Sequence, residues 1–441
     1  MSQSIQIKRG LNIPLAGAPS EQVTVDSKTT LFAISPDDFP GYTWKAKVKP
    51  GDEVEIGSPL LFAKEDEFIS LVSPVSGVVK EIKRGERRKI LFISVESDGK
   101  FTQNPEIASI EEPFELLKRS GLFAFIRQRP FDIVPGNEKP RDIFVTGFDS
   151  APLAPDLLAK LDRKRLEEGL RYLRKFTSGI VYLSVEEGTH ITSGATEVVE
   201  FNKLHPAGNP GVQAANIKPV NKGETIWTLD VTTAEKIGRL VKDKKLSFAT
   251  TVAITGPDAK NPHLVSTYDG ASLYTLLEGE IKDTENKVRI ISGNVLTGVK
   301  ETLENGFLRF PYRQITLIDE GDSADEFMGW ASLNPKKFSV KRSFPAFLTG
   351  LKNPFNFDAR IKGGHRAMIL SGEYDKVFPF DIYPEYLLKA IYAKDIEKME
   401  KLGIYEVSPE DFALPEFVDT SKNELQKAVR EGLDYLRKET L

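Results

Sequence analysis

The chain has 441 residues with a formal net charge of −4, and 40% of its residues are hydrophobic. At about 150 residues per domain, this length predicts three or four domains, and the weak negative charge excludes a strong basic field for nucleic acid. No apolar run reaches the ~18 residues that cross a bilayer, and the first residues lack the apolar core of a signal peptide. We therefore expect a cytoplasmic protein that meets a membrane only as a peripheral partner.

The sequence contains no cysteine and only four histidines, which lie far apart along the chain. The absence of cysteine excludes disulfides, a cysteine nucleophile and cysteine-ligated zinc or iron–sulfur sites within the chain. Isolated histidines argue against a multi-histidine metal centre. We predict no metal site, so redox chemistry requires a bound organic molecule or another chain.

Residues 47–85 read as a β-rich module in two halves, each with a glycine-centred turn and alternating apolar residues. This pattern resembles the biotinyl/lipoyl hammerhead, a small β-sandwich. Between the halves the sequence reads Lys64-Glu65-Asp66-Glu67-Phe68, without the neighbours that flank the modified lysine of carrier proteins. Two interpretations remain open: a structural β module, and an acyl or biotin carrier modified at Lys64.

A short helix is predicted over 114–120, ending at Gly121, where a left-handed residue would cap it. We expect an apolar loop to follow, carrying three phenylalanines and two arginines. These residues are Phe123, Phe125, Arg127, Arg129 and Phe131.

Residues 142–247 alternate between strand and helix patterns. Strands are expected over 142–146, 179–185, 197–202 and 225–230, and helices over 155–176 and 232–244, the second capped by Thr232 or Thr233. This order predicts a parallel, Rossmann-like sheet. No G-x-G-x-x-G motif follows the first strand, so the usual cradle for a pyrophosphate is not supported.

From residue 247 to about 318 the pattern becomes β-rich and resembles a ligand-binding β-grasp unit. Helices are predicted over 384–402 and 423–439 near the end of the chain. The expected fold class is therefore a multidomain α/β chain in four parts. These are residues 1–105 with the hammerhead, 106–246 with the Rossmann-like sheet, 247–330 with the β-grasp unit, and 331–441 with the helices.

The order of these parts resembles one protein family. The segments that carry the resemblance are IQIKRGLNIPLAGAPS, SGLFAFIRQRPF, HPAGNPG, ISGNVLTG, EFMGWA with KKFSVKRSF, and PFDIYPEYLLKAI. They span nearly the whole chain. They resemble the NqrA family, which comprises the A subunits of the sodium-translocating NADH:quinone reductases. That family is related to the flavoprotein subunit of complex I and to the C subunit of the Rnf complex.

The resemblance implies a subunit on the cytoplasmic side of the inner membrane, within a complex that oxidises NADH, reduces ubiquinone and transports sodium. It implies that NqrA proteins take part in ubiquinone binding, while NADH, flavins and iron–sulfur centres belong to partner subunits. The isolated chain is then expected to be inactive. The alternative is a purely structural scaffold of such an electron-transport complex.

Two departures from the relatives predict that the chain holds neither FMN nor an iron–sulfur centre, and no covalently bound cofactor. After Ser120-Gly121 the complex I relative continues into a glycine-rich FMN loop, whereas here large side chains follow, and backbone approaches a phosphate closely only where residues are small. The two cysteine motifs of the Rnf relative fall on residues that cannot replace thiolates on iron. Those residues are Met368, Ser371, Tyr374, Phe378, Pro409, Phe412, Pro415 and Asp419. We therefore expect residues 331–441 to resemble a ferredoxin-like module without clusters.

Quinones need an apolar, aromatic-lined slot with a few donors for the carbonyl oxygens. In the loop after Gly121, Phe123, Phe125 and Phe131 are candidates for the walls, and Arg127 or Arg129 for a donor; the alternative is that this loop only packs the neighbouring modules. His205, in the His-Pro-Ala-Gly turn, is a second candidate, because the ordinary pKa of histidine lies near neutrality and would allow proton transfer. Its alternative is a turn histidine that caps backbone groups.

Overall fold

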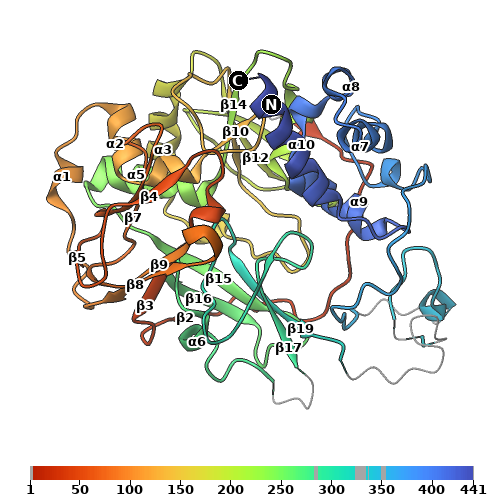
Figure 1. The fold of residues 1–441 in the computed structure, drawn as a ribbon, viewed down its shortest axis with the longest axis horizontal. Coiled ribbons are helices and arrows are strands. Elements are labelled where there is room, and N and C mark those ends of the chain that lie inside the picture. Colours follow the sequence, from red (N-terminus) through yellow and green to blue (C-terminus); the bar gives the residue numbers. More distant parts are fainter. Residues whose placement is uncertain (1–2, 283–286, 323–333, 336, 349–353, 441) are drawn as a thin grey trace.

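The computed structural model describes residues 3–440 except 283–286, 323–333, 336 and 349–353. Four β-sheets and a set of C-terminal helices make up this part of the chain (Figure 1). The fold is thus mixed α/β with several sheets, as expected. No helix in the described ranges has the length and apolar character needed to cross a membrane.

The main sheet has six strands in the order β1-β13-β12-β11-β14-β10. Its strands are β1 (Gln3–Ile5), β10 (Arg127–Arg129), β11 (Ile143–Thr146), β12 (Val181–Glu186), β13 (Glu197–Phe201) and β14 (Ile226–Asp230). All neighbours are parallel except β10, which runs antiparallel to β14 at the edge. The prediction of a parallel sheet from alternating strands and helices is confirmed.

Alternation along the strands gives the main sheet two apolar faces, each with its own core. On β11, Ile143 and Val145 join a core with helices α3 (Arg163–Leu173) and α5 (Val231–Asp243). Phe144 points the other way, into a core shared with α4 (Pro210–Ile217) and the C-terminal helices. The main sheet is therefore the central layer between two helical layers.

Helices α3 and α5 touch at two glycines. A Cβ atom on Gly169 would lie 1.8 Å from the carbonyl oxygen of Ala234, and one on Gly238 would lie 1.7 Å from that of Arg165. Any larger residue at either position would force the helices apart, since real Cβ contacts never come this close.

The second six-stranded sheet has the order β18-β17-β19-β15-β16-β2. Its strands are β2 (Val23–Val25), β15 (Ala249–Thr255), β16 (His263–Tyr268), β17 (Val288–Ser292), β18 (Val299–Glu301) and β19 (Gln314–Asp319). Strand β2 pairs with β16, just as β1 pairs with β13 of the main sheet. The first 25 residues thus complete two sheets whose other strands come from much later in the chain.

Two smaller sheets, ordered β3-β9-β8-β5 and β4-β6-β7, contain the segment predicted as a β module. Their strands are β3 (Leu31–Ile34), β4 (Trp44–Ala46), β5 (Glu53–Val54), β6 (Pro59–Ala63), β7 (Ser70–Val72), β8 (Gly77–Arg84) and β9 (Ile90–Ser97). Lys64 is an exposed residue at the start of the turn between β6 and β7, where its backbone N–H donates to the carbonyl of Thr43.

The remaining helices are short or lie at the C-terminal end. The α-helices are α1 (Pro105–Ala108), α2 (Pro113–Arg119), α6 (Leu273–Leu276), α7 (Pro384–Tyr392), α8 (Ile396–Lys401), α9 (Ala413–Val418) and α10 (Leu425–Thr440). The 3₁₀ helices are η1 (Pro36–Asp38), η2 (Glu86–Arg88), η3 (Leu122–Phe125), η4 (Leu158–Lys160), η5 (Arg174–Phe176), η7 (Pro345–Leu348), η8 (Tyr374–Lys376), η9 (Ile404–Glu406) and η10 (Pro409–Phe412).

Several predicted boundaries are wrong, each because a polar side chain ends or begins a helix. The single helix expected over 384–402 is interrupted where Lys394 takes a positive φ of 53° and the Asp395 carboxylate accepts from Lys398 N–H to begin α8. The helix expected over 155–176 begins only after Asp162, which caps α3. Asp230, not Thr232 or Thr233, caps α5 by accepting from the Thr233 N–H.

The prediction of a loop after Gly121 is also wrong. Gly121 does adopt the left-handed conformation, with φ 78°, but the chain continues as helix η3 and then as strand β10. The apolar side chains of η3 are all buried, because they form the contact between α2 and the main sheet. This segment therefore packs layers of the fold together, and only part of it lines a cavity.

Candidate functional site

A cleft of about 720 Å³ lies at the carboxyl ends of β11 and β14. Strands β12 and β13 follow β11 on one side of the main sheet, whereas β14 lies on its other side. The chain order therefore reverses between β11 and β14, and ligands of open α/β sheets bind at such a switch point. The volume is that of a typical small-molecule site.

Residues from every part of the chain line the cleft. Aromatic rings come from Phe125, Phe148, Phe310 and Tyr312. Cationic side chains are Arg127, Arg309, Arg313 and Arg430, and carboxyl groups are Asp37, Asp38, Asp132, Asp149, Asp230 and Glu410. The lining thus combines flat apolar surfaces with both signs of charge.

Three of the six predicted site residues line this cleft, namely Phe125, Arg127 and His205. They come from η3, β10 and the turn after β13, which lie far apart in sequence. The other three, Phe123, Arg129 and Phe131, do not line it and pack elsewhere.

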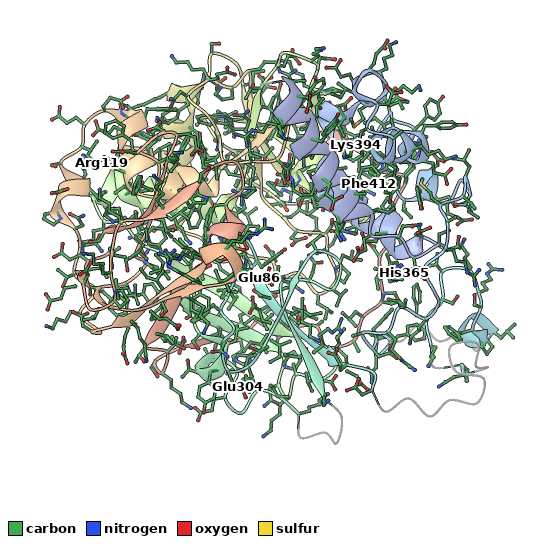
Figure 2. All side chains as sticks on the ribbon, in the orientation of Figure 1. Glu86, Arg119, Glu304, His365, Lys394 and Phe412 are labelled. Carbon is green, nitrogen blue, oxygen red and sulfur yellow. The ribbon has the colours of Figure 1, made fainter. Side chains whose placement is uncertain are left out.

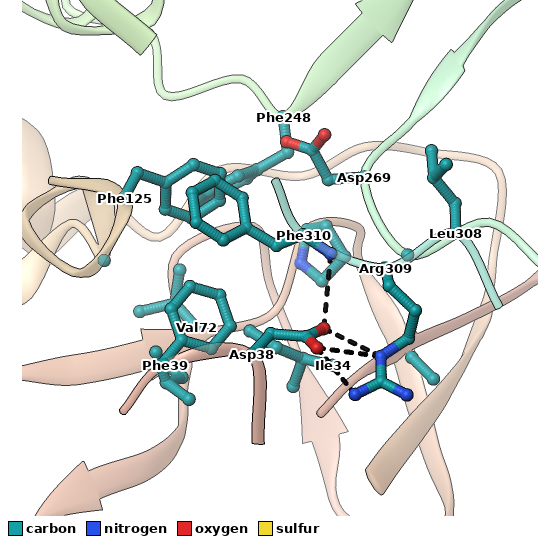
Figure 3. A pocket seen from close by; sticks show the side chains of 15 residues that line it. Ile34, Asp38, Phe39, Val72, Phe125, Phe248, Asp269, Leu308, Arg309 and Phe310 are labelled. Atoms are coloured by element: carbon teal, nitrogen blue, oxygen red, sulfur yellow. Dashed lines mark hydrogen bonds and ion pairs between the residues drawn. The ribbon is translucent and has the colours of Figure 1, made fainter. Parts of the chain in front are cut away.

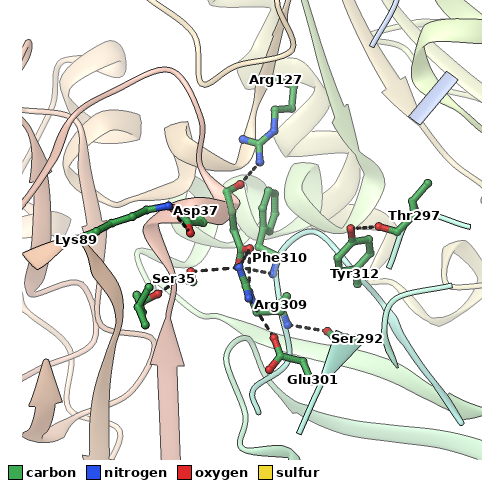
Figure 4. Close-up of polar contacts among 12 residues, drawn as sticks. Ser35, Asp37, Lys89, Arg127, Ser292, Thr297, Glu301, Arg309, Phe310 and Tyr312 are labelled. Carbon is green, nitrogen blue, oxygen red and sulfur yellow. Dashed lines mark hydrogen bonds and ion pairs between the residues drawn. The ribbon is translucent and has the colours of Figure 1, made fainter. Parts of the chain in front are cut away.

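Arg127 is held over the aromatic wall. Its guanidinium donates to the carbonyl oxygens of Ala124 and Asp38 and lies 5.1 Å from the centre of the Phe310 ring (Figure 4). Such a fixed guanidinium retains donors for a further partner, because it carries five N–H groups and these two contacts use only part of them. It can therefore offer a hydrogen bond to a ligand stacked on the same rings.

His205 is 4% exposed and sits beside the end of β11. Its Nδ1 lies 3.0 Å from Ser150 Oγ, and that oxygen accepts the Gly208 N–H at 2.8 Å. A Cβ on Gly208 would lie 2.4 Å from Ser150 N, so the contact requires glycine. The Ser150 hydroxyl therefore links the His205 ring to the backbone of the turn at Gly208.

The expectation that His205 titrates near neutrality is wrong. Burial lowers the pKa of His205 to about 4, so the ring is uncharged at pH 7. The uncharged imidazole carries one N–H donor and one acceptor nitrogen.

Phe123, Arg129 and Phe131 connect layers of the fold. The Phe123 ring packs edge-on against Trp227 of β14 at 5.5 Å, and Phe131 packs edge-on against Tyr405 at 6.4 Å. Arg129 is 1% exposed and forms an ion pair at 2.9 Å with the buried Asp411, which joins β10 to η10.

Two carboxyl groups in the cleft were not predicted from the sequence. Asp149 lies three residues beyond β11, is open to the cleft, and accepts the Ala151 N–H at 2.7 Å. Glu410 comes from η10, and one oxygen lies 3.3 Å from Arg129 Nη2. Position at the end of a parallel strand could have indicated Asp149, whereas Glu410 reaches the site only through tertiary packing.

Burial raises the pKa of Asp149, and the hydrogen bond from the Ala151 N–H opposes this shift only partly. Burial, and then the neighbouring carboxyl of Asp411, raise the pKa of Glu410 to about 8. Both groups therefore favour the uncharged acid more than an ordinary surface carboxyl does.

A second, much smaller cavity lies between η1 and the segment after β18 (Figure 3). Arg309 spans it, with Nη2 2.6 Å from Asp38 Oδ1, and the Phe310 N–H also donates to Asp38. A volume of about 30 Å³ matches a single water molecule rather than an organic ring. This cavity is a packing feature beside the cleft.

Near the C-terminal end, three of the residues compared above with two cysteine motifs, Tyr374, Phe378 and Phe412, belong to one apolar core. The rings of Phe378 and Phe412 lie 4.9 Å apart, and Tyr374 and Asp419 are buried beside them (Phe412 is labelled in Figure 2). Among the described residues, no group of three or more histidine, aspartate and glutamate side chains is arranged to hold a metal ion.

Comparison with known proteins identifies the class of protein to which this fold and cleft belong. Three family models match in order: the NqrA N-terminal barrel-sandwich hybrid domain over residues 5–98, the NqrA second alpha/beta domain over 109–246, and the NQRA C-terminal domain over 251–302. Together they indicate a protein of the NqrA class.

Curated relatives match over the whole chain. The chain is 36% identical to a protein of Hahella chejuensis (99% of this chain and 100% of the relative), 33% identical to one of Rhodopirellula baltica (99% and 99%) and 34% identical to one of Pasteurella multocida (99% and 100%). The chain belongs to the NqrA family of Na(+)-translocating NADH-quinone reductase subunits. Its relatives are thus subunits of a sodium-translocating NADH–quinone oxidoreductase, as the sequence motifs predicted.

A solved NAD+-reducing [NiFe]-hydrogenase in its H2-reduced state is also similar, with a TM-score of 0.33 and 11% identity, covering 69% of this chain and 55% of that chain. A likeness at this level carries no inference about function.

Proposed function

We propose that this chain contributes a ubiquinone-binding cleft to a sodium-translocating NADH:ubiquinone reductase. One observation carries the proposal: the cleft at the β11–β14 switch point joins aromatic surfaces to fixed hydrogen-bond donors. A quinone headgroup is flat, uncharged and edged by carbonyl oxygens, so it requires this combination.

The contacts of the cleft suggest how the headgroup is held. Phe125 and Phe310 pack with ring centres 4.4 Å apart and form one wall. Arg127 on this wall is a donor for one carbonyl oxygen, and the His205 side chain also lines the cleft. An isoprenoid tail would leave through the open side of the cleft toward its source in the membrane.

We further propose that the chain holds no flavin or iron–sulfur centre and receives its substrate in a complex whose other subunits bind NADH, flavins and iron–sulfur clusters. Buried η3 side chains occupy the segment that is glycine-rich in the flavin-binding relative. At the switch point, the carboxylate of Asp230 already caps α5 and would repel a phosphate. The expected position is peripheral, on the cytoplasmic side of the inner membrane.

The four-part organisation remains part of this proposal. We assign a hammerhead to residues 1–105, a Rossmann-like domain to 106–246, a β-grasp unit to 247–330 and a cluster-free ferredoxin-like module to 331–441. The strand order of the main sheet supports the second assignment. Strands β1 and β2 cross the first boundary, since they pair with β13 and β16.

The alternative function is an assembly scaffold, and one surface favours it. Helix α7 and the residue before it expose three tyrosines, with Tyr383 70%, Tyr386 54% and Tyr392 51% accessible. Exposed tyrosines are enriched at protein interfaces. If the chain only holds its neighbours, Tyr383→Ala with Tyr386→Ala should release it from the complex, while Arg127→Ala leaves quinone turnover intact.

Binding of ubiquinone-1 to the purified full chain tests the first proposal. Hydrogen exchange should slow in 124–130, 146–151 and 205–210 when the quinone is added. Calorimetry should show Arg127→Ala weakening binding about 3- to 10-fold, the effect of one lost hydrogen bond of about 1 kcal/mol. Lys28→Ala, which removes an exposed ion pair outside the lining of the cleft, is the matched control. Saturable binding with no protection of these segments, or no binding, contradicts the proposal.

A further inference from the structure

A strongly basic hairpin lies at the surface of the small sheet β3-β9-β8-β5. Residues 80–91, called here the basic hairpin, comprise the second half of β8, helix η2 and the start of β9. They include six basic and two acidic residues, in a chain whose net charge is −4. None of residues 80–89 is buried, so packing does not explain this concentration of positive charge.

The arginines at the tip of the basic hairpin can bind an external anion. The ion pairs of this segment within the described residues are those of its lysines, and Arg84, Arg87 and Arg88 take part in none. Arg84 donates to the carbonyl oxygen of Arg88 at 3.0 Å, which leaves other N–H groups for a further acceptor. Arg87 and Arg88 have left-handed backbones, with φ 51° and 61°. Because glycine or asparagine suits such positions better, the conformation of the turn does not explain arginine there.

Two contacts tie the basic hairpin to the rim of the cleft (Figure 4). Lys89 Nζ lies 2.8 Å from Asp37, which lines the cleft although its side chain is 45% exposed. Ser35 Oγ donates to the Leu91 carbonyl at 2.8 Å and accepts from Nη2 of Arg309, another cleft residue, at 3.2 Å. A surface that binds the basic hairpin would therefore lie beside the opening of the cleft.

The chemistry of the basic hairpin matches a surface of phosphate groups. A guanidinium donates to two phosphate oxygens at once, and each arginine or lysine near an anionic lipid surface strengthens binding about fivefold. Leu91, beside the basic residues, is 38% exposed. Such an apolar side chain fits the boundary between headgroups and acyl chains.

We propose that the basic hairpin docks on anionic phospholipid headgroups and so holds the opening of the cleft against the membrane surface. The link to the cleft rests on the proposed function, because a ubiquinone tail must pass between the cleft and the membrane. The lipid contact itself needs no quinone. An acidic protein surface is the competing partner, and the experiment separates the two.

Flotation of the purified full chain with lipid vesicles tests this inference. Phosphatidylcholine vesicles with about 30% phosphatidylglycerol should bind the chain at about 50 mM salt and release it at about 500 mM, because salt screens exposed charges. Vesicles of phosphatidylcholine alone should not bind it. Arg87→Gln with Arg88→Gln should weaken binding about 30-fold, whereas Arg87→Lys with Arg88→Lys keeps both charges and should stay within about threefold of the wild type.

Arg163→Gln with Lys164→Gln is the matched control. These two exposed residues begin α3, so the variant loses the same charge outside the basic hairpin. Its binding should stay within about threefold of the wild type. Glu86→Gln should instead strengthen binding, because it removes a negative charge from the tip.

Absence of binding at about 50 mM salt, equal binding to both kinds of vesicle, or an equal loss in the α3 control overturns the inference. If vesicles do not bind the chain but the double glutamine variant leaves the assembled complex, the partner is an acidic protein surface and the inference is wrong. The two wild-type vesicle measurements decide the matter if a variant fails to fold.

Calorimetry with ubiquinone-1 keeps this inference apart from the proposed function. Arg87 and Arg88 do not line the cleft, so their double glutamine variant should bind ubiquinone-1 as the wild type does. A wild-type chain that binds the anionic vesicles but no ubiquinone-1 contradicts the proposed function and leaves the lipid contact standing. One that binds ubiquinone-1 but no vesicles contradicts only the inference.

Discussion

Arg129 joins the main sheet to the C-terminal helices, and replacing it by methionine should weaken that junction strongly. The guanidinium is 1% exposed and donates to Asp411, Ser408 and the carbonyl oxygen of Glu406, each at 2.9 Å. Methionine preserves the length of the stem but leaves the fully buried Asp411 carboxylate without a cation. Breaking a buried ion pair in this way costs about 3–5 kcal/mol.

Hydrogen exchange of α9 and α10 measures this loss locally, since a chain of several sheets need not unfold in two states. The predicted loss corresponds to exchange roughly 100- to several thousandfold faster for the slowest amides of these helices. Arg129→Met combined with Asp411→Asn should be no less stable than Arg129→Met alone, because the second change removes the uncompensated charge.

Arg119→Met removes a half-exposed ion pair with Glu115 on the surface of α2 and should change exchange less than about threefold. The reasoning about Arg129 is refuted if Arg129→Met exchanges within threefold of the wild type.

Three further predictions concern single positions. Gly208→Ala should displace Ser150 from His205, because its Cβ would lie 2.4 Å from Ser150 N; a lower thermal midpoint and loss of ubiquinone-1 binding check this, and unchanged values of both would contradict it. Lys64 should be unmodified, so the intact mass of protein from its native host should equal the sequence mass of 49.2 kDa; an added acyl or biotin mass would revive the carrier interpretation. Below pH 6.5 the unfolded chain binds a proton at His205, whereas the folded chain, in which the pKa of His205 is about 4, does not. The contribution of His205 to the free energy of unfolding is therefore present in full above pH 6.5 and is lost as the pH falls to 4. The loss is about 2–4 kcal/mol, and exchange-derived opening free energies should fall less between pH 7 and pH 4 in His205→Gln than in the wild type.

Local patterns predicted the layers of the fold better than their connections. The alternation of strands and helices between residues 142 and 247 was enough to predict the parallel sheet, because each element carries its own apolar period. The partners of β1, β2 and β10 could not be predicted. The pairing of such short strands depends on which sheet edge, distant in sequence, they meet rather than on their own residues. Helix boundaries were missed wherever an aspartate cap replaced the expected threonine or broke a continuous apolar pattern.

The candidate site shows the same division. Phe125, Arg127 and His205 were found because aromatic and basic residues stand out within short motifs. Arg129 belongs to the same motif, but its burial against Asp411 depends on a segment about 280 residues away. Asp149 and Glu410 became candidates only because they line the assembled cleft.

The pairing of β1 with β13 and of β2 with β16 has a consequence for how the protein is made. Residues 3–25 leave the ribosome about 200 residues before their partners exist, which at ~5–20 residues per second is roughly 10–40 s of synthesis. During this interval two strand edges have nothing to bind, so the main sheet closes only after Asp230 has been translated and the second sheet only after Asp319. Slowing translation after residue 25 would lengthen that unpaired interval, and with it the time available for chaperones or for misassembly.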